Sequence, residues 1–157
     1  MTRAAFLNLN EKQLMALTIY REASGEPPEG KIAVGTVILE RVDHRNWDGK
    51  TVNEVCLWPR QFSCFDETDK GFGKTLHTAE TWALCIDTDF SLMDSYTVAV
   101  GMLTGIIPRN PILAAAHCCQ YLNPTRAPET RARWIAKGMT SLLVIKNHEF
   151  FDDRGVK

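Results

Sequence analysis

The sequence predicts an α+β fold that is mostly helical and carries a small β-sheet. Two apolar patterns at helical spacing indicate long core helices, one over about residues 10–23 and the other from Pro28 to about Val42. A third pattern, rich in β-branched and aromatic residues over 140–151, predicts a short strand or hairpin. With 157 residues, 45% of them hydrophobic, the chain suits one compact domain over residues 1–157.

The first predicted helix has recognisable signals at both ends. Asn10 can cap its start with Gln13 three residues further on, as in a capping box, and Gly25 ends it after Ala23. Glu22 therefore falls in the last helical turn. There the helix dipole disfavours a negative charge and burial acts in the same direction, so we expect a raised pKa for the Glu22 carboxyl.

The middle of the chain has weaker patterns. Residues 43–74 contain scattered glycine, proline and aromatic residues and are predicted to form a long, partly ordered excursion. Two more helices are predicted over 78–88 and 92–104, and Ser91 with Asp94 suggests a capping box for the second.

Charge and hydropathy exclude several classes of protein. Lys and Arg number 18 against 19 Asp and Glu, which gives a net charge of −1, and no basic run indicates nucleic-acid binding. The longest apolar stretch, Pro111 to Cys119, is interrupted by His117 and is too short to cross a membrane. The first residues lack the apolar core of a signal peptide, so we expect synthesis in the cytoplasm.

The cysteines form an odd set without Cys-x-x-Cys spacing, which predicts reduced thiols that act as small core residues. They are Cys56, Cys64, Cys85, Cys118 and Cys119. His117 beside Cys118 and Cys119, with His148 further on, offers metal-ligating groups. Adjacent residues on a strand point to opposite faces, however, so we expect neither a metal site nor a cofactor.

The segment from Ile19 to Gly30 places three carboxylates between the two core helices. Glu22, Glu26 and Glu29 lie around a helix end, a glycine break and a Pro-Pro restart. Such a position is a rigid mounting for a general acid. Spacing alone, however, favours ordinary solvated residues near a helix end.

This segment also carries a specific motif. The pattern Tyr-x-Glu-Ala-x-Gly-Glu-Pro-x-x-Gly runs from Tyr20 to Gly30, and Ala-Val-x-x-Val-Ile-Leu-x-Arg-Val follows over 33–42. With Phe62-Ser63, these motifs resemble the cell-wall hydrolase family of the spore cortex-lytic enzymes and related phage lysins. A weaker echo follows in four places: Tyr121-Leu122-Asn123-Pro124, Trp134, Ile145 and His148-Glu149-Phe150.

The sequence departs from the family pattern in two respects. Lys146-Asn147 stands where the family has a glycine, and residues 66–111 match no pattern of the family. The resemblance implies a lysozyme-like or lytic-transglycosylase-like domain, with helices around a groove and a small sheet at its edge.

The resemblance also implies a catalytic residue and its partners. It implies Glu22 as the catalytic acid. In the implied reaction, Glu22 first protonates the oxygen of the glycosidic bond and then, as a carboxylate, removes the proton from the C6 hydroxyl of the muramoyl sugar. An ordinary glycosidase would need a second carboxylate, for which Glu26, Glu29, Asp66 and Glu67 are candidates. Expected substrate-binding residues are Ser63, Tyr121, Asn123 and Glu26, although for Glu26 capping of the second helix is the stronger expectation. Four aromatic residues either stack on sugar rings or anchor the loop to the core: Trp58, Phe62, Phe65 and Phe72.

The expected function is degradation of peptidoglycan glycan strands at the MurNAc–GlcNAc β-1,4 bond, by a lytic transglycosylase or a muramidase. The simplest source is a monomeric phage endolysin that is made without a signal peptide and acts on the wall after release. Two alternatives remain open. One is a zinc-dependent N-acetylmuramoyl-L-alanine amidase built on His117, a cysteine and His148, and the other is a non-catalytic wall-binding or virion protein.

Overall fold

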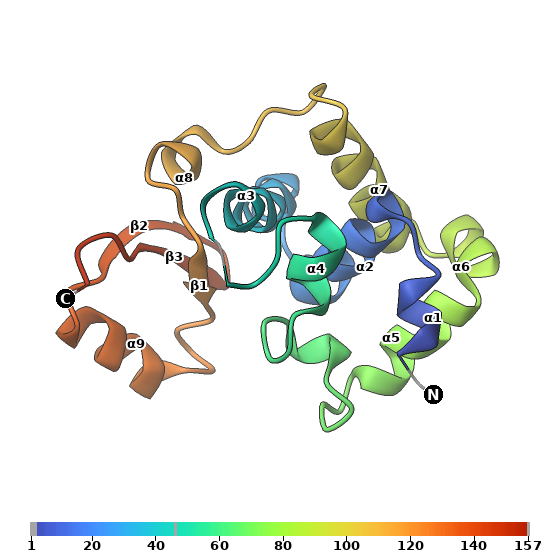
Figure 1. The fold of residues 1–157 in the computed structure, drawn as a ribbon, viewed down its shortest axis with the longest axis horizontal. Helices are drawn as coiled ribbons and strands as arrows, with labels where there is room; N and C mark the ends of the chain where they lie inside the picture. Colours follow the sequence, from blue (N-terminus) through green and yellow to red (C-terminus); the bar gives the residue numbers. More distant parts are fainter. Residues whose placement is uncertain (1–2, 46, 157) are drawn as a thin grey trace.

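A computed structural model describes residues 3–45 and 47–156 of the chain. Two helices form its centre, α2 (Glu11–Ala23) and α3 (Pro28–His44). A third long helix, α7 (Phe90–Leu103), packs against α2 (Figure 1). The expected mostly helical α+β fold is confirmed.

Shorter helices surround this centre within the described ranges: α1 (Ala4–Leu7), α4 (Val52–Leu57), the 3-10 helix η1 (Ser63–Phe65), α5 (Phe72–Glu80), α6 (Trp82–Thr88), α8 (Pro111–Ala115) and α9 (Pro128–Ala136). In Figure 1, α8, α9 and the sheet lie to the left of α3, whereas α1, α5 and α6 lie to the right. None of the helices in the described part of the chain is both long and apolar enough to span a membrane.

The capping box predicted at the start of α2 is confirmed. The Gln13 amide donates to the Asn10 side chain at 3.0 Å, and the Asn10 amide donates to the Gln13 side chain at 3.0 Å. Every residue from Leu14 to Ile19 is buried, so α2 runs through the core. The hydroxyl of Thr18, inside this run, donates to the carbonyl of Leu14 at 2.9 Å and is therefore satisfied without water.

The single helix predicted over 78–88 is wrong. The chain breaks at Thr81 into α5 and α6, because Thr81 has φ −116° and ψ 34°. Its hydroxyl donates to the carbonyl of His77 at 2.7 Å. Side chains that bond to the nearby backbone in this way compete with regular helix continuation.

The predicted capping box of Ser91 and Asp94 is also wrong. Asp89 caps α7, because its Oδ1 accepts the amides of Ser91 at 2.9 Å and Leu92 at 3.1 Å. The hydroxyl of Tyr20 donates to the other oxygen of Asp89 at 2.7 Å. The cap therefore also joins the start of α7 to α2.

Residues 43–74, predicted to be a long and only partly ordered loop, contain more regular structure than expected. They contain α4, which begins with a capping box of Thr51 and Glu54, as well as η1 and the start of α5. Helices α8 and α9 were not predicted. Each starts with a proline at its first position, and Asn110 caps α8 by accepting two backbone amides.

The sheet has three antiparallel strands in the order β1-β3-β2: β1 (Gln120–Leu122), β2 (Thr140–Ile145) and β3 (His148–Asp152). The hairpin predicted at 140–151 is confirmed as β2 and β3, whereas β1 was not predicted. Lys146 lies in the turn between β2 and β3 with φ 46°, a conformation that favours glycine.

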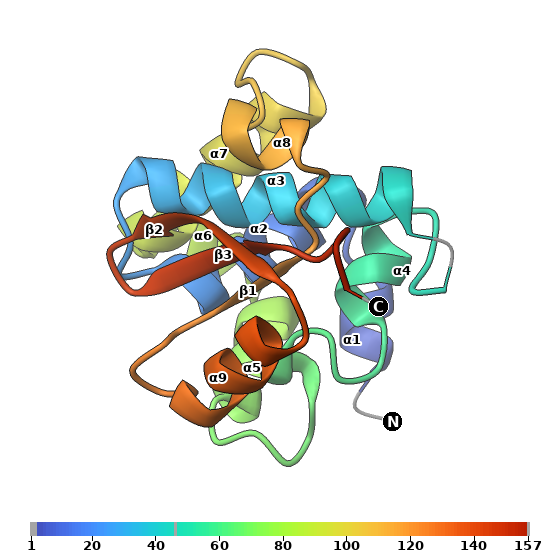
Figure 2. The same ribbon diagram turned by 90° about the vertical axis from the view of Figure 1, so that its left-hand side faces the viewer.

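The central strand β3 is buried on both faces. On one face Phe150 packs with Ala33 and Val37 of α3, and on the other Phe151 packs with Trp134 of α9. Figure 2 shows the sheet between these two helices. Phe150 also lies opposite Tyr121 in the ladder, so the sheet positions β1 beside the central helices.

Candidate active site

Glu22 lies half-buried in the last turn of α2 and contacts the sheet. The hydroxyl of Tyr121 in β1 donates to Glu22 Oε2 at 2.8 Å. The Tyr121 ring is held in turn by Phe150, at a centroid distance of 5.4 Å, and by His148, at 5.1 Å. The fold therefore joins two predicted site residues that are 99 positions apart.

Burial raises the pKa of the Glu22 carboxyl above its ordinary value. The hydrogen bond from Tyr121 and the charge of Arg41 lower this pKa, because both favour the carboxylate, whereas the charge of Asp69 raises it. Desolvation is the largest effect and decides the direction. Glu22 thus keeps its proton to higher pH than an exposed glutamate does, which is what a general acid requires.

We expect Tyr121→Phe to move the alkaline limb of the pH–activity profile to higher pH. The substitution removes the donor that stabilises the Glu22 carboxylate, so the pKa of Glu22 rises further. Initial rates on purified peptidoglycan across a pH series measure this limb. Tyr96→Phe, on α7, is the matched control and should leave it in place. A limb that stays fixed or moves to lower pH in Tyr121→Phe contradicts the role given to the hydroxyl.

Arg41 is a buried cation on α3 that the sequence analysis missed. Its Nε donates to the carbonyl of Cys119 at 2.9 Å, and its guanidinium lies 5.0 Å from the centroid of the Phe62 ring. Its Nη1 is buried and has no hydrogen-bond partner among the described residues. An unpaired buried donor is costly, which indicates a task beyond packing. The available signal was the arginine of the Ala-Val-x-x-Val-Ile-Leu-x-Arg-Val motif over 33–42.

Ser63 and Asn123 stay predictions as substrate contacts. Ser63 is exposed at the start of η1, where its carbonyl accepts the amide of Asp66 at 2.8 Å. The side-chain oxygen of Asn123 accepts the amides of Thr125 at 3.0 Å and Arg126 at 3.2 Å. Asn123 therefore shapes the turn after β1 and keeps only its amide donors for a ligand.

Glu26 is buried beside His148 rather than displayed to solvent. Its Oε1 lies 3.9 Å from His148 Nδ1, and its Oε2 and the same His148 nitrogen have no hydrogen-bond partner in the described part of the chain. Burial lowers the pKa of His148, which keeps its ring uncharged at neutral pH. No side-chain hydrogen bond caps the start of α3 at Pro27, so the expected role of Glu26 at the dipole of this helix stays a prediction.

Gly30 allows Glu26 to pack on the first turn of α3. A Cβ at residue 30 would lie 2.7 Å from the Cβ of Glu26, closer than packed carbon atoms approach. We expect Gly30→Ala to destabilise the protein by about 1–3 kcal/mol, the usual cost of overpacking, although alanine is the better helix former. Chemical denaturation measures the loss. The control is Gly35→Ala, whose Cβ meets the movable thioether of Met102 and should cost less. Equal losses contradict the argument.

The other carboxylates weighed as catalytic partners have different surroundings. Glu29 is exposed. Asp66 Oδ1 accepts the amide of Thr68 at 2.9 Å and its hydroxyl at 2.8 Å, so this carboxylate closes a local turn. Asp69, which was not considered, is the carboxylate whose charge raises the pKa of Glu22.

The loop aromatics mostly anchor the chain. Phe62, Phe65 and Phe72 are buried, and Phe6 of α1 packs against Phe65 at 5.1 Å and Phe72 at 6.0 Å between ring centroids. Trp58 differs because it is 40% exposed and lines a cavity of about 440 Å³ with Phe62 and Phe65. Of the four loop aromatics, only Trp58 therefore has enough exposed ring surface to stack on a sugar.

The two histidines of the amidase alternative are not brought together. His117 lies against Glu40 in the C-terminal half of α3, whereas His148 lies against Glu26, before the start of that helix. About 18 Å of helix separates residue 28 from residue 40. All five cysteines are unpaired, and all but Cys85 are buried, as expected for core thiols.

The chain matches the family model described as Cell Wall Hydrolase over residues 25–151. It belongs to the cell wall hydrolase family. Glu22 lies three residues before the matched range, so the role of this carboxyl rests on its own geometry.

Two curated relatives of this cell wall hydrolase are spore cortex-lytic enzymes. The chain is 46% identical over 54 residues to the enzyme of Oceanobacillus iheyensis and 44% identical over 54 residues to that of Bacillus cereus. Each match covers 34% of this chain and only 19% or 20% of the relative, so the chain corresponds to a small part of their length.

Two solved structures share the fold. The catalytic domain of the germination-specific lytic transglycosylase SleB from Bacillus anthracis has a TM-score of 0.61 and 24% identity, over 92% of this chain and 95% of that chain. The catalytic domain of the Bacillus cereus SleB protein has a TM-score of 0.58 and 23% identity, over 90% and 88%. The predicted lysozyme-like, lytic-transglycosylase-like fold class is confirmed.

Proposed function

We propose that this cell wall hydrolase cleaves peptidoglycan glycan strands at the MurNAc–GlcNAc β-1,4 bond, by the lytic transglycosylase route. The observation that carries the proposal is the Glu22 carboxyl, whose pKa burial raises and whose Oε2 accepts the Tyr121 hydroxyl at 2.8 Å. A single acid with a raised pKa suits a reaction in which one group acts first as acid and then as base.

The proposed reaction uses Glu22 twice. Protonated Glu22 gives its proton to the glycosidic oxygen, and the bond from C1 of the muramoyl residue to that oxygen breaks. The Glu22 carboxylate then takes the proton of the C6 hydroxyl on the same sugar, and O6 bonds to C1. The product carries a 1,6-anhydromuramoyl end, no water is consumed, and Glu22 regains its proton.

Two neighbours support this cycle. Tyr121 and Arg41 both favour the carboxylate that forms after the first proton transfer, because each lowers the pKa of Glu22. Burial favours the protonated form at the start. The opposing influences keep both forms within reach, as a group that must give and regain a proton requires.

The test is mass spectrometry of fragments released from purified peptidoglycan. The transglycosylase route predicts fragments one water lighter than those of hydrolysis. Fragments with hydrolysed glycan ends would instead identify a muramidase. In that case Glu22 would remain the acid, and a second group would be required to activate water. Released peptides with intact glycan chains support the amidase, and binding to the wall without fragments supports the non-catalytic protein.

We extend the proposal to a monomeric phage endolysin that is made in the host cytoplasm and reaches the wall after release. The unpaired cysteines support it, because thiols persist in a reducing compartment. Expression alone should leave cells intact, whereas co-expression with a pore-forming holin should lyse them. Lysis without the pore contradicts this part of the proposal and leaves the glycan chemistry untouched.

A further inference from the structure

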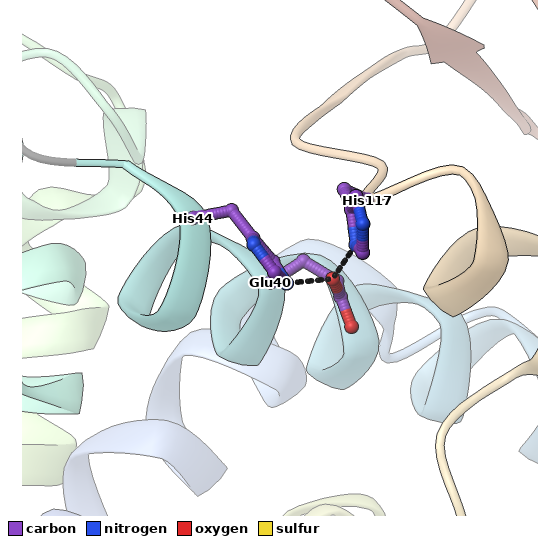
Figure 3. Close-up of side chains that lie close together, drawn as sticks. All are labelled: Glu40, His44 and His117. Atoms are coloured by element: carbon purple, nitrogen blue, oxygen red, sulfur yellow. Dashed lines mark hydrogen bonds and ion pairs between the residues drawn. The ribbon is translucent and has the colours of Figure 1, made fainter.

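Three side chains of types that bind metal ions lie close together beside α3. Glu40 and His44 lie one turn apart on this helix, and His117 lies in the turn between α8 and β1. Glu40 Oε2 is 3.2 Å from His44 Nε2 and 3.3 Å from His117 Nδ1. Figure 3 shows both rings directed at the same carboxylate oxygen.

We propose that Glu40, His44 and His117 bind a divalent transition-metal ion, with Zn²⁺ as the best fit. Zinc–nitrogen and zinc–oxygen bonds of about 2.0–2.2 Å give edges of about 3.3–3.5 Å between tetrahedral ligands. The two N···O separations at Glu40 match these edges, and one ligand atom from each residue lies within 4.8 Å of the others. Small rotations of the exposed imidazoles complete the site.

The surroundings of Glu40 suit a ligand that coordinates through one oxygen. Glu40 is only 2% exposed, and its Oε1 accepts Arg109 Nη1 at 2.7 Å, which fixes the carboxylate with Oε2 toward the histidines. Arg109 also pairs with Asp43 at 2.7 Å, so two carboxylates face one guanidinium and leave one negative charge. Such outer hydrogen bonds orient metal ligands.

The histidines provide access for the ion. The His44 and His117 side chains are 41% and 47% exposed, and their ring centroids are 3.8 Å apart. An ion between them would have three protein ligands and a fourth position open to water. His117 has φ 50°, an uncommon conformation for a residue with a side chain, which is consistent with a constrained, functional position.

The site does not depend on the proposed reaction. Arg41, the residue after Glu40, contacts Phe62 and the Cys119 carbonyl, whereas Glu40 contacts Arg109. Helix α3 therefore directs Arg41, whose charge acts on Glu22, and Glu40, which contacts the two histidines, in different directions. A bound ion would instead fasten the end of α3 to the segment that leads into β1 and Tyr121. We therefore assign the ion a stabilising role.

Titration of the purified, metal-free protein with zinc chloride tests the proposal. Calorimetry should give one ion per chain, and the melting temperature should rise by about 5–10 °C at a hundredfold excess over the dissociation constant. Co²⁺ should bind without a thiolate-to-metal charge-transfer band, because the ligands are nitrogen and oxygen. No binding, or a thiolate band, overturns the assignment.

Variants locate the ion. His44→Gln and His117→Gln should each weaken zinc binding by at least about tenfold, and the double variant should abolish it. His77→Gln, on the exposed surface of α5, is the matched control and should bind like the wild type. Glu22→Gln should also bind zinc normally, which separates this test from that of the reaction. Wild-type affinity in the double variant disproves the site.

Discussion

Glu22→Gln should abolish wall-degrading activity and leave the domain folded. The amide keeps the shape of the side chain and can still accept the Tyr121 hydrogen bond, but it has no proton to transfer. Loss of general acid catalysis costs on the order of a hundredfold or more in rate. Turbidity loss of purified cell walls measures it, and clearance at the wild-type rate would remove Glu22 from the proposed reaction.

The same variant tests the pKa argument through stability. Burial raises the folded-state pKa of Glu22 above its unfolded value, so the acid contributes stability that is complete below the unfolded pKa. That contribution is lost as the pH rises through the folded pKa. At neutral pH, Glu22→Gln should therefore be at least as stable as the wild type. A large loss of stability there contradicts the raised pKa.

Glu29→Gln is the matched control for both measurements. It removes a carboxylate from the same signature segment, but this side chain is exposed in the first turn of α3. Activity and stability close to those of the wild type are expected, because exposed substitutions usually change stability by no more than about 0.5 kcal/mol. If Glu29→Gln is also inactive, catalysis does not belong to Glu22 alone.

Phe150→Ala should have the largest effect on stability. Phe150 is fully buried on the central strand and joins α3, α8 and the sheet through one apolar cluster. Truncating such a side chain costs about 3–5 kcal/mol, which lowers the melting temperature of a protein of this size by about 6–20 °C. Activity should fall as well, since the ring packs against Tyr121 at 5.4 Å.

Phe90→Ala is the matched control for this loss. Phe90 is 81% exposed at the start of α7, so its substitution by alanine removes the same atoms without leaving a cavity in the core. We expect its melting temperature to stay within about 2 °C of the wild type. Calorimetry compares the two variants, and losses of similar size would show that Phe150 is not a core contact of the kind described.

The sequence was most informative where local signals agreed with the tertiary structure. Asn10 with Gln13 marked the start of α2 correctly, and the β-branched and aromatic residues of 140–151 marked the hairpin, because caps and strand composition are local properties. The helix boundaries predicted near Thr81 and Asp89 were wrong, because each of these side chains hydrogen-bonds to a backbone group that residue spacing does not specify. Strand β1 was missed because three residues carry too little pattern.

By itself, the sequence determined the helical core and the family motif, since these depend on residue types and their spacing. The resemblance that this motif carries, rather than spacing, implied Glu22 as the candidate acid. Only the tertiary structure decided the surroundings of Glu22. Tyr121 reaches it through sheet pairing, and the charge of Arg41 acts on it from a neighbouring helix. Glu40, His44 and His117 also meet only in the fold. Hydrogen bonds and electrostatic interactions act over a few ångströms of space, and distance along the chain does not predict that proximity.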